Sequence, residues 1–400
     1  GMYGVKFYLN GRWVTVLVDD LIPCTFDGQY WQPIFSKAMK HIHQITGEKE
    51  MWAMIFEKAW AKLNLSYEAT DGGFTADTTN FLTGGTIKAF EVEDENWDIL
   101  HNYTADASKI AFLSCSIRPN LPEANVLMST WGLMDGHAYS VLELRRARNG
   151  QKFVHVRNPW GDGNEWKGRF SDRDKTSWTK ELKTELKHDA QDDGKFWMLW
   201  EDFSYFFGTI EVCDPTAIAA VTEGHHEHCI VDVFSSHWIR GMTAGGPESC
   251  KTFKHNPVCI LTVEKSGPVE ICLYQPDVRP VQTVTKAEHL TVLLYLVDMH
   301  TGKKTELCES AKRVNCYKLD HAVAGRQYQL IAAAWGPGVE SAFWITAAGS
   351  GAQLNAAPET TPNKEEEDIM ALETPRKTCC VVCHEEDNEG YYQTKEGYKC

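Results

Sequence analysis

Two short runs with alternating apolar residues open the chain and predict a β-hairpin. Residues 5–9 and 13–18 flank the pair Asn10-Gly11. An Asn-Gly pair adopts the left-handed backbone of a two-residue turn, which makes it the strongest short-range hairpin signal. Over residues 50–65 the apolar spacing changes to that of a helix. The chain therefore starts with two strands that a helix follows.

The rest of the chain is mainly strands by its apolar pattern. A charged stretch at 175–195 predicts a helix and then a loop, and from about 229 to 347 strand follows strand with Gly/Pro turns between them. The latter pattern is typical of an all-β sandwich. Before it, apolar or alternating runs predict strands over 110–117, 138–144, 153–157 and 209–213.

Composition changes after the predicted sandwich. Residues 348–378 are rich in Ala, Pro, Thr and Glu and contain an acidic run. Such a segment cannot bury a core, so it predicts a flexible acidic linker. The predicted parts of the chain are 1–85, 86–222, 223–347, 348–378 and 379–400.

Length, charge and cysteine usage narrow the functional classes. With 400 residues and 43% hydrophobic content, two or three domains with sizeable cores are expected. The net charge of −15 and the lack of a Lys/Arg run argue against nucleic-acid binding. The longest strongly apolar run, 292–297, is too short to cross a bilayer. No secretory signal opens the chain, and we expect a fragment whose start has been cut. The 13 cysteines lie mostly singly in apolar runs, which favours reduced thiols and a cytoplasmic location.

His137 and Asn158 are the candidate catalytic pair. They lie roughly twenty residues apart at the ends of a predicted hairpin, beside Gly136 and Pro159. In a Cys-His-Asn hydrolase the imidazole takes the thiol proton, and the Asn amide oxygen orients the ring. Either residue alone is more often a core or turn residue. Together, with Trp160 placed to cover their hydrogen bond from water, they indicate two-thirds of such a site.

Several further motifs lie in order along the chain: the stretch 56–69, Gly72-Gly73, Thr83-Gly84-Gly85, Gly136-His137-Ala138-Tyr139-Ser140-Val141 and Arg157-Asn158-Pro159-Trp160-Gly161. Together they resemble the calpain family of cysteine proteases, and the resemblance covers nearly all of residues 3–215. It implies an α+β fold: a papain-like calpain protease core, made of an incomplete first subdomain (1–85) and a β-rich second subdomain (86–222), then an all-β sandwich and a disordered tail. It also implies a calcium-dependent cysteine endopeptidase in intracellular proteolysis.

The nucleophile is not evident in this chain. In the calpain family, which this chain resembles, the nucleophilic Cys lies in a Gly-x-Cys-Trp segment that begins a helix and precedes the strands seen here. Cys24 follows Pro23 in a turn, and Cys115 lies within a predicted strand. Neither begins a helix, where the dipole would favour a thiolate. We therefore expect the chain to begin after the nucleophile and to be inactive alone.

By the same resemblance, Gly72, Gly73 and Gly136 would line the substrate cleft, where an extended peptide could pair main chain to main chain; tight turns are the alternative. Calcium, which prefers several oxygen ligands, would be held by carboxylates. Lys195 stands where the family has Glu and opposes metal binding, so ordinary surface carboxylates remain an equal alternative. The implied ligands are Glu50 for a first site and Glu165, Asp172 and Asp193 for a second.

The tail carries a second metal hypothesis. Cys380, Cys383 and Cys400 have the spacing of the first half of a zinc-binding module, whose fourth ligand would lie beyond residue 400. The histidines at 225–228 are better explained as an exposed linker cluster.

Two functional classes stay open. The chain belongs either to an active calpain-like endopeptidase that cleaves protein substrates, or to a non-catalytic homologue that acts as a scaffold or regulatory binding protein. The β-sandwich could add contact with membrane lipid or protein. The intact His-Asn-Trp set favours the enzyme, because a scaffold has no use for that geometry.

Overall fold

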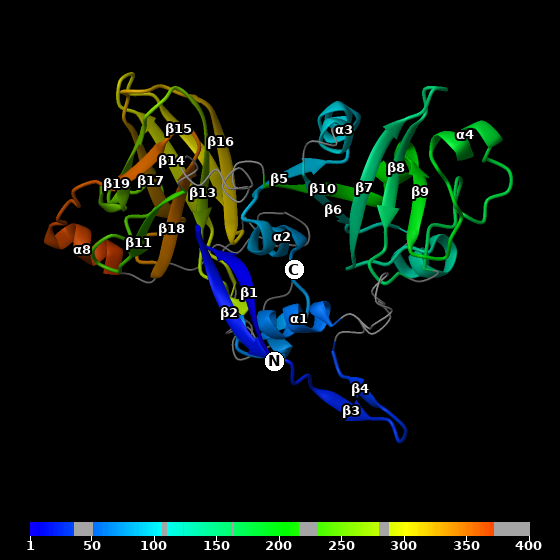
Figure 1. Ribbon diagram of the computed structural model, residues 1–400. Helices are drawn as coiled ribbons and strands as arrows, with labels where there is room; N and C mark the ends of the chain where they lie inside the picture. Colours follow the sequence, from blue (N-terminus) through cyan, green and yellow to red (C-terminus); the bar gives the residue numbers. More distant parts are fainter. Residues whose placement is uncertain are drawn as a thin grey trace. The chain divides into compact units, whose positions relative to one another are not determined.

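A computed structural model gives the fold, and its contacts divide the chain into two compact units (Figure 1). The first unit comprises the described residues of 1–74, 81–84 and 230–379. The second comprises those of 75–80 and 85–229. The residues that the structure describes are 1–35, 51–105, 110–122, 124–161, 164–215, 231–279 and 288–371.

A six-stranded antiparallel sheet forms the centre of the second unit. Some of its strands bury side chains on both faces, so a core forms on each side of the sheet. The order of strands across the sheet is β5 (Thr86–Glu91), β10 (Phe207–Asp214), β6 (Phe112–Ile117), β7 (Ala138–Arg146), β8 (Lys152–Arg157) and β9 (Lys195–Leu199).

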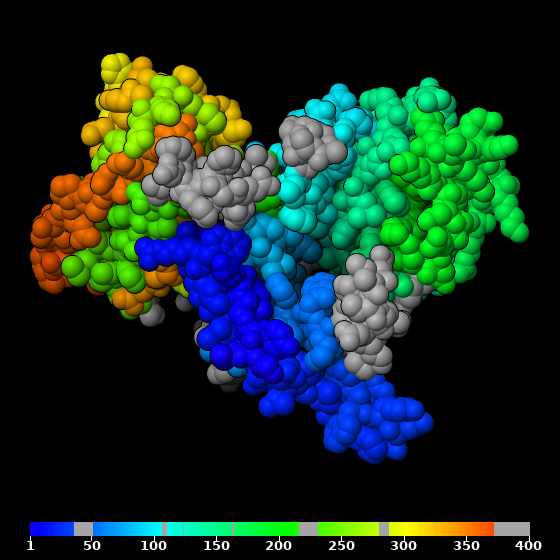
Figure 2. Space-filling model, in the orientation of Figure 1, coloured from blue at the N-terminus to red at the C-terminus, as the bar shows by residue number. Residues whose placement is uncertain are grey.

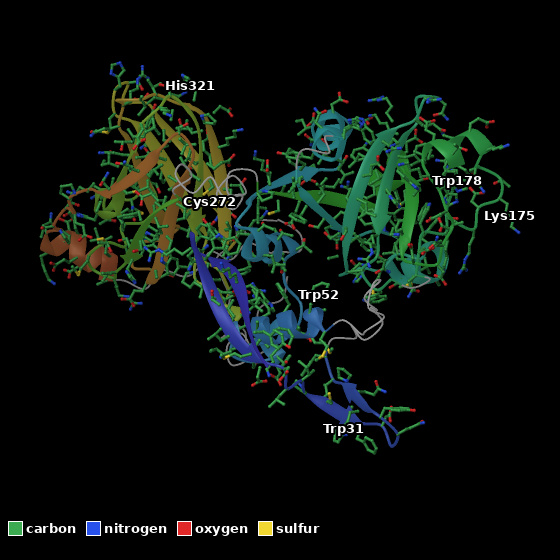
Figure 3. All side chains as sticks on the ribbon, viewed as in Figure 1. Trp31, Trp52, Lys175, Trp178, Cys272 and His321 are labelled. Atoms are coloured by element: carbon green, nitrogen blue, oxygen red, sulfur yellow. The ribbon has the colours of Figure 1, made fainter. Side chains whose placement is uncertain are left out.

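Helices and aromatic side chains cover this sheet. Trp97 at the start of α3 is 1% exposed and meets Trp200 at a ring separation of 5.0 Å. Trp178, labelled in Figure 3, stacks on His188 at 4.0 Å. Helix α2 (Thr75–Thr83) begins in this unit and ends in the first. The other helical segments of this region are η3 (Asp94–Asn96), α3 (Trp97–Ala105), η4 (Ala124–Val126), η5 (Leu127–Trp131), α4 (Lys180–Glu185) and α5 (Trp200–Phe206).

The predicted N-terminal hairpin and helix are both present in the first unit. Strands β1 (Met2–Leu9) and β2 (Arg12–Asp19) pair across a two-residue turn in which Asn10 and Gly11 have φ of 49° and 89°. These positive angles are what an Asn-Gly turn supplies. The remaining elements before residue 75 are β3 (Cys24–Phe26), β4 (Trp31–Pro33), α1 (Trp52–Leu63) and η2 (Glu68–Thr70).

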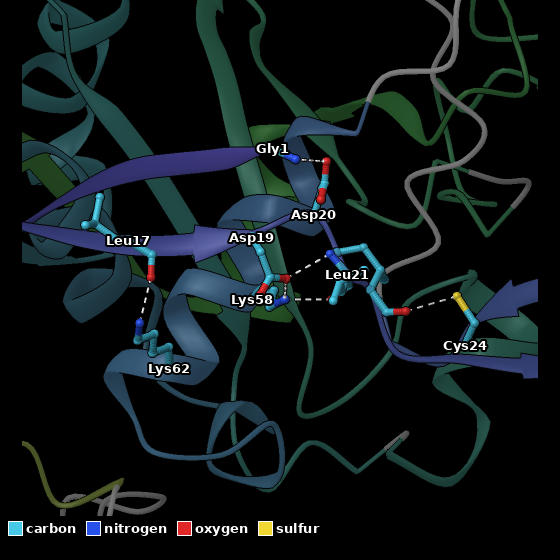
Figure 4. A network of polar contacts seen from close by, with 9 residues as sticks. Gly1, Leu17, Asp19, Asp20, Leu21, Cys24, Lys58 and Lys62 are labelled. Atoms are coloured by element: carbon cyan, nitrogen blue, oxygen red, sulfur yellow. Dashed lines mark hydrogen bonds and ion pairs between the residues drawn. The ribbon is translucent and has the colours of Figure 1, made fainter.

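Helix α1 holds the end of the hairpin through two lysines (Figure 4). The Lys62 ammonium donates to the Leu17 carbonyl at 2.7 Å. Lys58 forms an ion pair with Asp19 and donates to the Leu21 carbonyl at 2.6 Å. The helix also buries an apolar face against the strands, so polar and apolar contacts support the same arrangement.

The predicted β-sandwich consists of two antiparallel sheets. Buried side chains from alternate positions of both sheets form one core, as expected of facing sheets. One sheet has the order β11 (Asp232–Trp238), β18 (Ser341–Ala348), β13 (Gly267–Tyr274), β16 (Val314–Ala322). The other has β15 (Lys304–Ser310), β14 (Val292–Asp298), β17 (Tyr328–Ala334), β12 (Val258–Val263), β19 (Ala352–Ala356), and η6 (Phe253–His255) precedes β12.

The linker predicted over 348–378 is wrong in its first part. Strand β19 pairs with β12 and completes a sheet, and helix α8 (Lys364–Ala371) follows. Met370 is fully buried, and the carboxylate of Glu366 lies 3.0 Å from the buried His255 ring. The average composition of the segment is polar, but a few well-placed apolar side chains suffice to dock a short strand and helix.

The hairpin packs on one sheet of the sandwich, within the first unit (Figure 2). A Cβ built on Gly11 would come within 2.6 Å of Thr346 and 2.7 Å of Val233, so the turn lies directly on β18 and β11. The guanidinium of Arg313 lies 3.9 Å from the Phe81 ring centroid, and it donates to the Asn10 side chain at 3.0 Å.

We predict that Arg313→Met lowers the free energy of unfolding by about 2 kcal/mol. The side chain is 2% exposed, and the variant loses a charge-assisted hydrogen bond and a desolvated cation–π contact. Denaturant titration of the chain measures the change. Arg326→Met is the matched control, because the partly exposed Arg326–Asp298 pair at 3.5 Å should contribute no more than about 1 kcal/mol. An unchanged midpoint for Arg313→Met would show that desolvation of the guanidinium offsets its contacts.

The predicted fold class is confirmed: a region that mixes helices with an antiparallel sheet is followed by a sheet-rich sandwich. Among the described residues, no helix has the length and apolar character needed to cross a membrane.

Candidate active site

His137 and Asn158 meet at one end of the β7–β8 hairpin. His137 immediately precedes β7 and Asn158 immediately follows β8, and these strands pair antiparallel with Ser140 opposite Arg157. The His137 Nε2 lies 2.9 Å from the Asn158 Oδ1. Gly136, with φ of 63°, supplies the left-handed turn that leads into the histidine. The pair that the sequence predicted is therefore joined by a direct hydrogen bond.

The surroundings of Asn158 decide which way its amide points. The side chain is fully buried, and its Nδ2 donates to the Asn164 carbonyl at 3.0 Å. Its Oδ1 accepts from the Trp160 backbone N–H at 3.1 Å. Since Oδ1 can only accept, the proton of His137 must lie on Nε2 and the lone pair on Nδ1. In the neutral form of the ring, the asparagine thus leaves Nδ1 free to act as a base.

Two aromatic rings fix the imidazole plane. The Trp160 ring lies 4.6 Å from the His137 ring centroid, tilted by 47°, and Tyr139 meets the same ring edge-on at 5.0 Å. Trp160 was expected to cover the pair and is itself 47% exposed. Tyr139 is buried, which raises the pKa of its hydroxyl to about 12, and the hydroxyl accepts from the Met134 N–H at 2.8 Å.

Sequence reasoning missed Tyr139 and Gly194 as supports of the site. The strand period of two places Tyr139 on the same side as His137, which is the signal that could have found it. Gly194, with φ of 83°, accepts from the Asn158 N–H at 2.7 Å, and a Cβ there would meet the Asn158 carbonyl at 2.6 Å. The Asp-Gly pair at 193–194 ahead of an apolar strand marks that turn.

The two cysteines considered as nucleophiles have unsuitable surroundings. Cys115 lies in β6 opposite Tyr139 and is 4% exposed, and burial raises the pKa of its thiol well above the usual value. Cys24 lies in β3, and its Sγ donates to the Ile22 carbonyl at 3.3 Å (Figure 4). Neither thiol lies at a helix start, so neither has the environment that stabilises a thiolate.

The glycines predicted to line the cleft have the open surroundings that this role requires. Gly72, Gly73 and Gly136 have φ of 74°, 132° and 63°. A Cβ on Gly72 or Gly136 would meet nothing within 4 Å, and one on Gly73 would approach only the Arg279 guanidinium at 3.4 Å. Gly72 and Gly73 belong to the first unit and Gly136 to the second.

The carboxylates predicted for the second calcium site lie around one loop. Glu165 Oε1 accepts from the backbone N–H groups of Asp193 and Gly194 at 3.1 and 2.7 Å. Burial, and then the negative charge of Glu165 and other nearby carboxylates, raises the pKa of Asp172 to about 7. A bound cation would stabilise a carboxylate whose ionisation is opposed first by burial and then by its negative neighbours.

Lys195 works against that site, as the sequence suggested. Its ammonium lies 2.5 Å from Asp193 Oδ2, and although burial opposes it, this contact holds the pKa of Asp193 below its usual value. Among the described residues, His, Cys, Asp and Glu side chains form no group of three or more that could hold a metal ion. The calcium hypothesis for Glu165, Asp172 and Asp193 therefore stays a prediction.

The other predicted metal ligands lie outside the described residues. These are Glu50 for the first calcium site and Cys380, Cys383 and Cys400 for the zinc module, together with the histidines at 225–228. Both metal hypotheses for these residues stay predictions.

Comparison with known proteins identifies the family. A histidine oriented by a buried asparagine is the base and orienter of a cysteine-hydrolase type of site. Residues 1–214 match the calpain family cysteine protease model, and the chain belongs to the calpain family.

Its relatives are much longer proteins. The calpain-type cysteine protease ADL1 of Oryza sativa subsp. japonica is 35% identical over 266 residues, 64% of this chain and 11% of that protein. Calpain-B of Drosophila melanogaster is 30% identical over 278 residues, 66% of this chain and 29% of that protein. Calpain-9 of Rattus norvegicus is 33% identical over 281 residues, 68% of this chain and 39% of that protein. The chain thus spans between about a tenth and two-fifths of these relatives.

Proposed function

We propose that this chain is the base-bearing part of a calcium-dependent cysteine endopeptidase that acts in intracellular proteolysis. The observation that carries the proposal is the 2.9 Å hydrogen bond between His137 Nε2 and the buried Asn158 Oδ1. The cysteine nucleophile would come from a segment ahead of residue 1 in the full-length protein. The chain by itself would then be inactive.

The geometry supports a two-step acyl transfer. The unprotonated Nδ1 of His137 takes the thiol proton as sulfur attacks the scissile carbonyl, and the imidazolium then protonates the leaving amine. Water hydrolyses the thioester with the same base, which restores the thiol. Throughout, Asn158 accepts from Nε2 and keeps the ring in its plane, and Trp160 shields that hydrogen bond.

An extended polypeptide is the substrate that the glycines support. A Cβ on Gly72 or Gly136 would meet no atom within 4 Å, and one on Gly73 only the Arg279 guanidinium at 3.4 Å, so a peptide main chain could approach each of these glycines closely. Contact of the β-sandwich with lipid or protein partners, and a cytoplasmic location, stay predictions.

A non-catalytic scaffold is the second candidate, and Lys195 favours it. The Lys195 ammonium pairs with Asp193, a carboxylate that a calcium-dependent enzyme would use to bind the metal ion. The coding sequence upstream of residue 1 separates the two: a Gly-x-Cys-Trp segment supports the protease, and Ser, Gly or Ala in place of that Cys supports the scaffold.

The direct test is proteolysis by the full-length protein. We expect it to cleave an unfolded protein substrate when calcium is added, and to stop after alkylation with iodoacetamide. Cleavage that survives alkylation, or no cleavage with the Cys in place, would overturn the proposal.

Calcium binding makes a separate prediction through Asp172. Because its folded pKa is about 7 against a usual 3.8, stability present at low pH is lost as the pH rises from about 4 to about 7. Asp172→Asn should therefore stabilise the calcium-free chain at pH 8 by about 2 kcal/mol, after allowance for solvent screening, and should have little effect near pH 4.

Thermal unfolding with and without calcium measures this. At pH 8, calcium should raise the Tm of the parent chain and leave that of Asp172→Asn nearly unchanged. Asp98→Asn is the control, because the Asp98 side chain is 87% exposed. Equal calcium shifts in all three proteins would argue against a site at Asp172.

A further inference from the structure

Two thiols lie next to each other on neighbouring strands of one sandwich sheet, the sheet that the hairpin covers. Cys272 in β13 lies directly opposite Cys316 in the antiparallel edge strand β16. Their sulfur atoms are 2.8 Å apart, and both cysteines are free. Directly opposite side chains leave the same face of a sheet, with Cβ atoms about 4.5–5.5 Å apart. This separation overlaps what a disulfide needs.

From this arrangement we infer a redox modification site, in which Cys272 and Cys316 are oxidised to an intramolecular disulfide by a small-molecule disulfide. Figure 3 labels Cys272 on its strand. The site is independent of the proposed proteolytic chemistry, because neither thiol belongs to the unit that holds His137.

The exposure of the two thiols sets the order of steps. Cys316 is partly exposed, whereas Cys272 is 4% exposed. The Cys316 thiolate attacks one sulfur of the reagent, whose S–S bond breaks to leave a mixed disulfide and one thiolate. The Cys272 thiolate then attacks the Cys316 Sγ and expels the second thiolate. Two protons leave the protein, and two electrons pass to the reagent, which is released as two reduced thiols.

We expect the second step to be slow at neutral pH, because the Cys272 thiol resists deprotonation. The contact with Cys316, and then burial, raises the pKa of the Cys272 thiol well above its usual value. The second step should therefore accelerate as the pH rises. In a reducing compartment the pair would stay reduced and would form the bond only under oxidative load.

The two cysteines lie on the face of the sheet that the hairpin β1–β2 covers. This hairpin belongs to the part of the chain that matches the calpain protease model. Four residues that lie opposite one another on β11, β18, β13 and β16 project from the same face of the sheet: Val233, Thr346, Cys272 and Cys316. Gly11 packs against the first two. Tyr8 is buried, which raises the pKa of its hydroxyl, and the two nearby thiols raise that pKa further. A disulfide there would tie the edge strand to its neighbour under the docked turn.

Cys308 provides the matched control. It lies in β15 of the other sheet, is partly buried and interacts electrostatically with Cys316. Burial raises the pKa of its thiol to about 12. Non-selective oxidation of cysteines in the sandwich would also modify Cys308. A disulfide that depends on the direct cross-strand pairing of Cys272 with Cys316 would leave Cys308 reduced.

The test is disulfide mapping of the full chain. The folded protein is incubated with glutathione disulfide, free thiols are alkylated, and the digest is analysed by mass spectrometry without reduction. Among the cysteines of the described residues we expect one disulfide, Cys272–Cys316, which dithiothreitol reverses and which forms faster at pH 8.5 than at pH 7. Cys316→Ala should abolish it, and Cys308→Ala should retain it.

Three outcomes would overturn the inference: a Cys308–Cys316 bond, a disulfide between two chains, or both thiols still alkylated after treatment. The mapping of the unaltered chain needs no variant, so poor folding of Cys316→Ala would leave the test intact.

Discussion

Replacing His137 with alanine in the full-length protein is expected to lower kcat/KM by about 10⁴-fold or more, which corresponds to about 5.4 kcal/mol of transition-state stabilisation. The variant loses the imidazole Nδ1, the proposed base, which the buried Asn158 orients through its hydrogen bond to Nε2. The loss should fall mainly on kcat, because the imidazole moves a proton and contributes little to binding the peptide.

A graded variant separates the two roles. Asn158→Ala keeps the base but frees its ring, so we expect a smaller loss, on the order of 10²-fold, with KM little changed. Initial-rate measurements over a range of peptide concentrations give both parameters. His321→Ala is the control for the substitution itself, because that exposed histidine lies on β16 of the sandwich (Figure 3).

Two results would contradict this assignment. Cleavage by His137→Ala at the parent rate would remove the imidazole from the chemistry. A loss for Asn158→Ala that exceeds the loss for His137→Ala would mean that the asparagine acts through the fold of the 158–164 turn. Unfolding measurements on both variants distinguish that case.

Gly132→Ala is expected to destabilise the chain by about 3–5 kcal/mol, the largest stability effect that we predict. Gly132 ends the helical turn η5 with φ of 72°. A Cβ there would lie 1.8 Å from the carbonyl oxygen of Glu165, which is backbone and cannot move aside freely. The same Glu165 holds the turn at Asp193 and Gly194 beneath Asn158.

Gly150→Ala provides the comparison. Gly150 has a similar positive φ of 88° in the β7–β8 turn, and its Cβ would meet nothing within 4 Å. It should cost only about 1 kcal/mol of backbone strain. Denaturant unfolding measures both variants, and similar losses for the two would show that the close approach at Gly132 is relieved by movement of the 165–167 backbone.

Local patterns were sufficient for most of the secondary structure. The Asn10-Gly11 turn was predicted because only a few residue types accept two consecutive positive φ angles. The alternation in 138–144 predicted β7, and the apolar run in 153–157 predicted β8. The segment after 348 was missed because β19 depends on pairing with β12, some ninety residues earlier, and its own composition carries no such signal.

By itself, the sequence determined the residue types of the candidate site and their order: a histidine before one strand, an asparagine after the next, and a tryptophan two residues on. Those choices are local, because turn and strand preferences place them. Only the tertiary structure decided the direction of the Asn158 amide, the burial of Cys115 and the Lys195–Asp193 contact. The first and third of these depend on how short turns fold, since Asn158 contacts Asn164 and Lys195 contacts Asp193. The burial of Cys115 depends on strands that are distant in the sequence. A one-dimensional pattern contains neither kind of information.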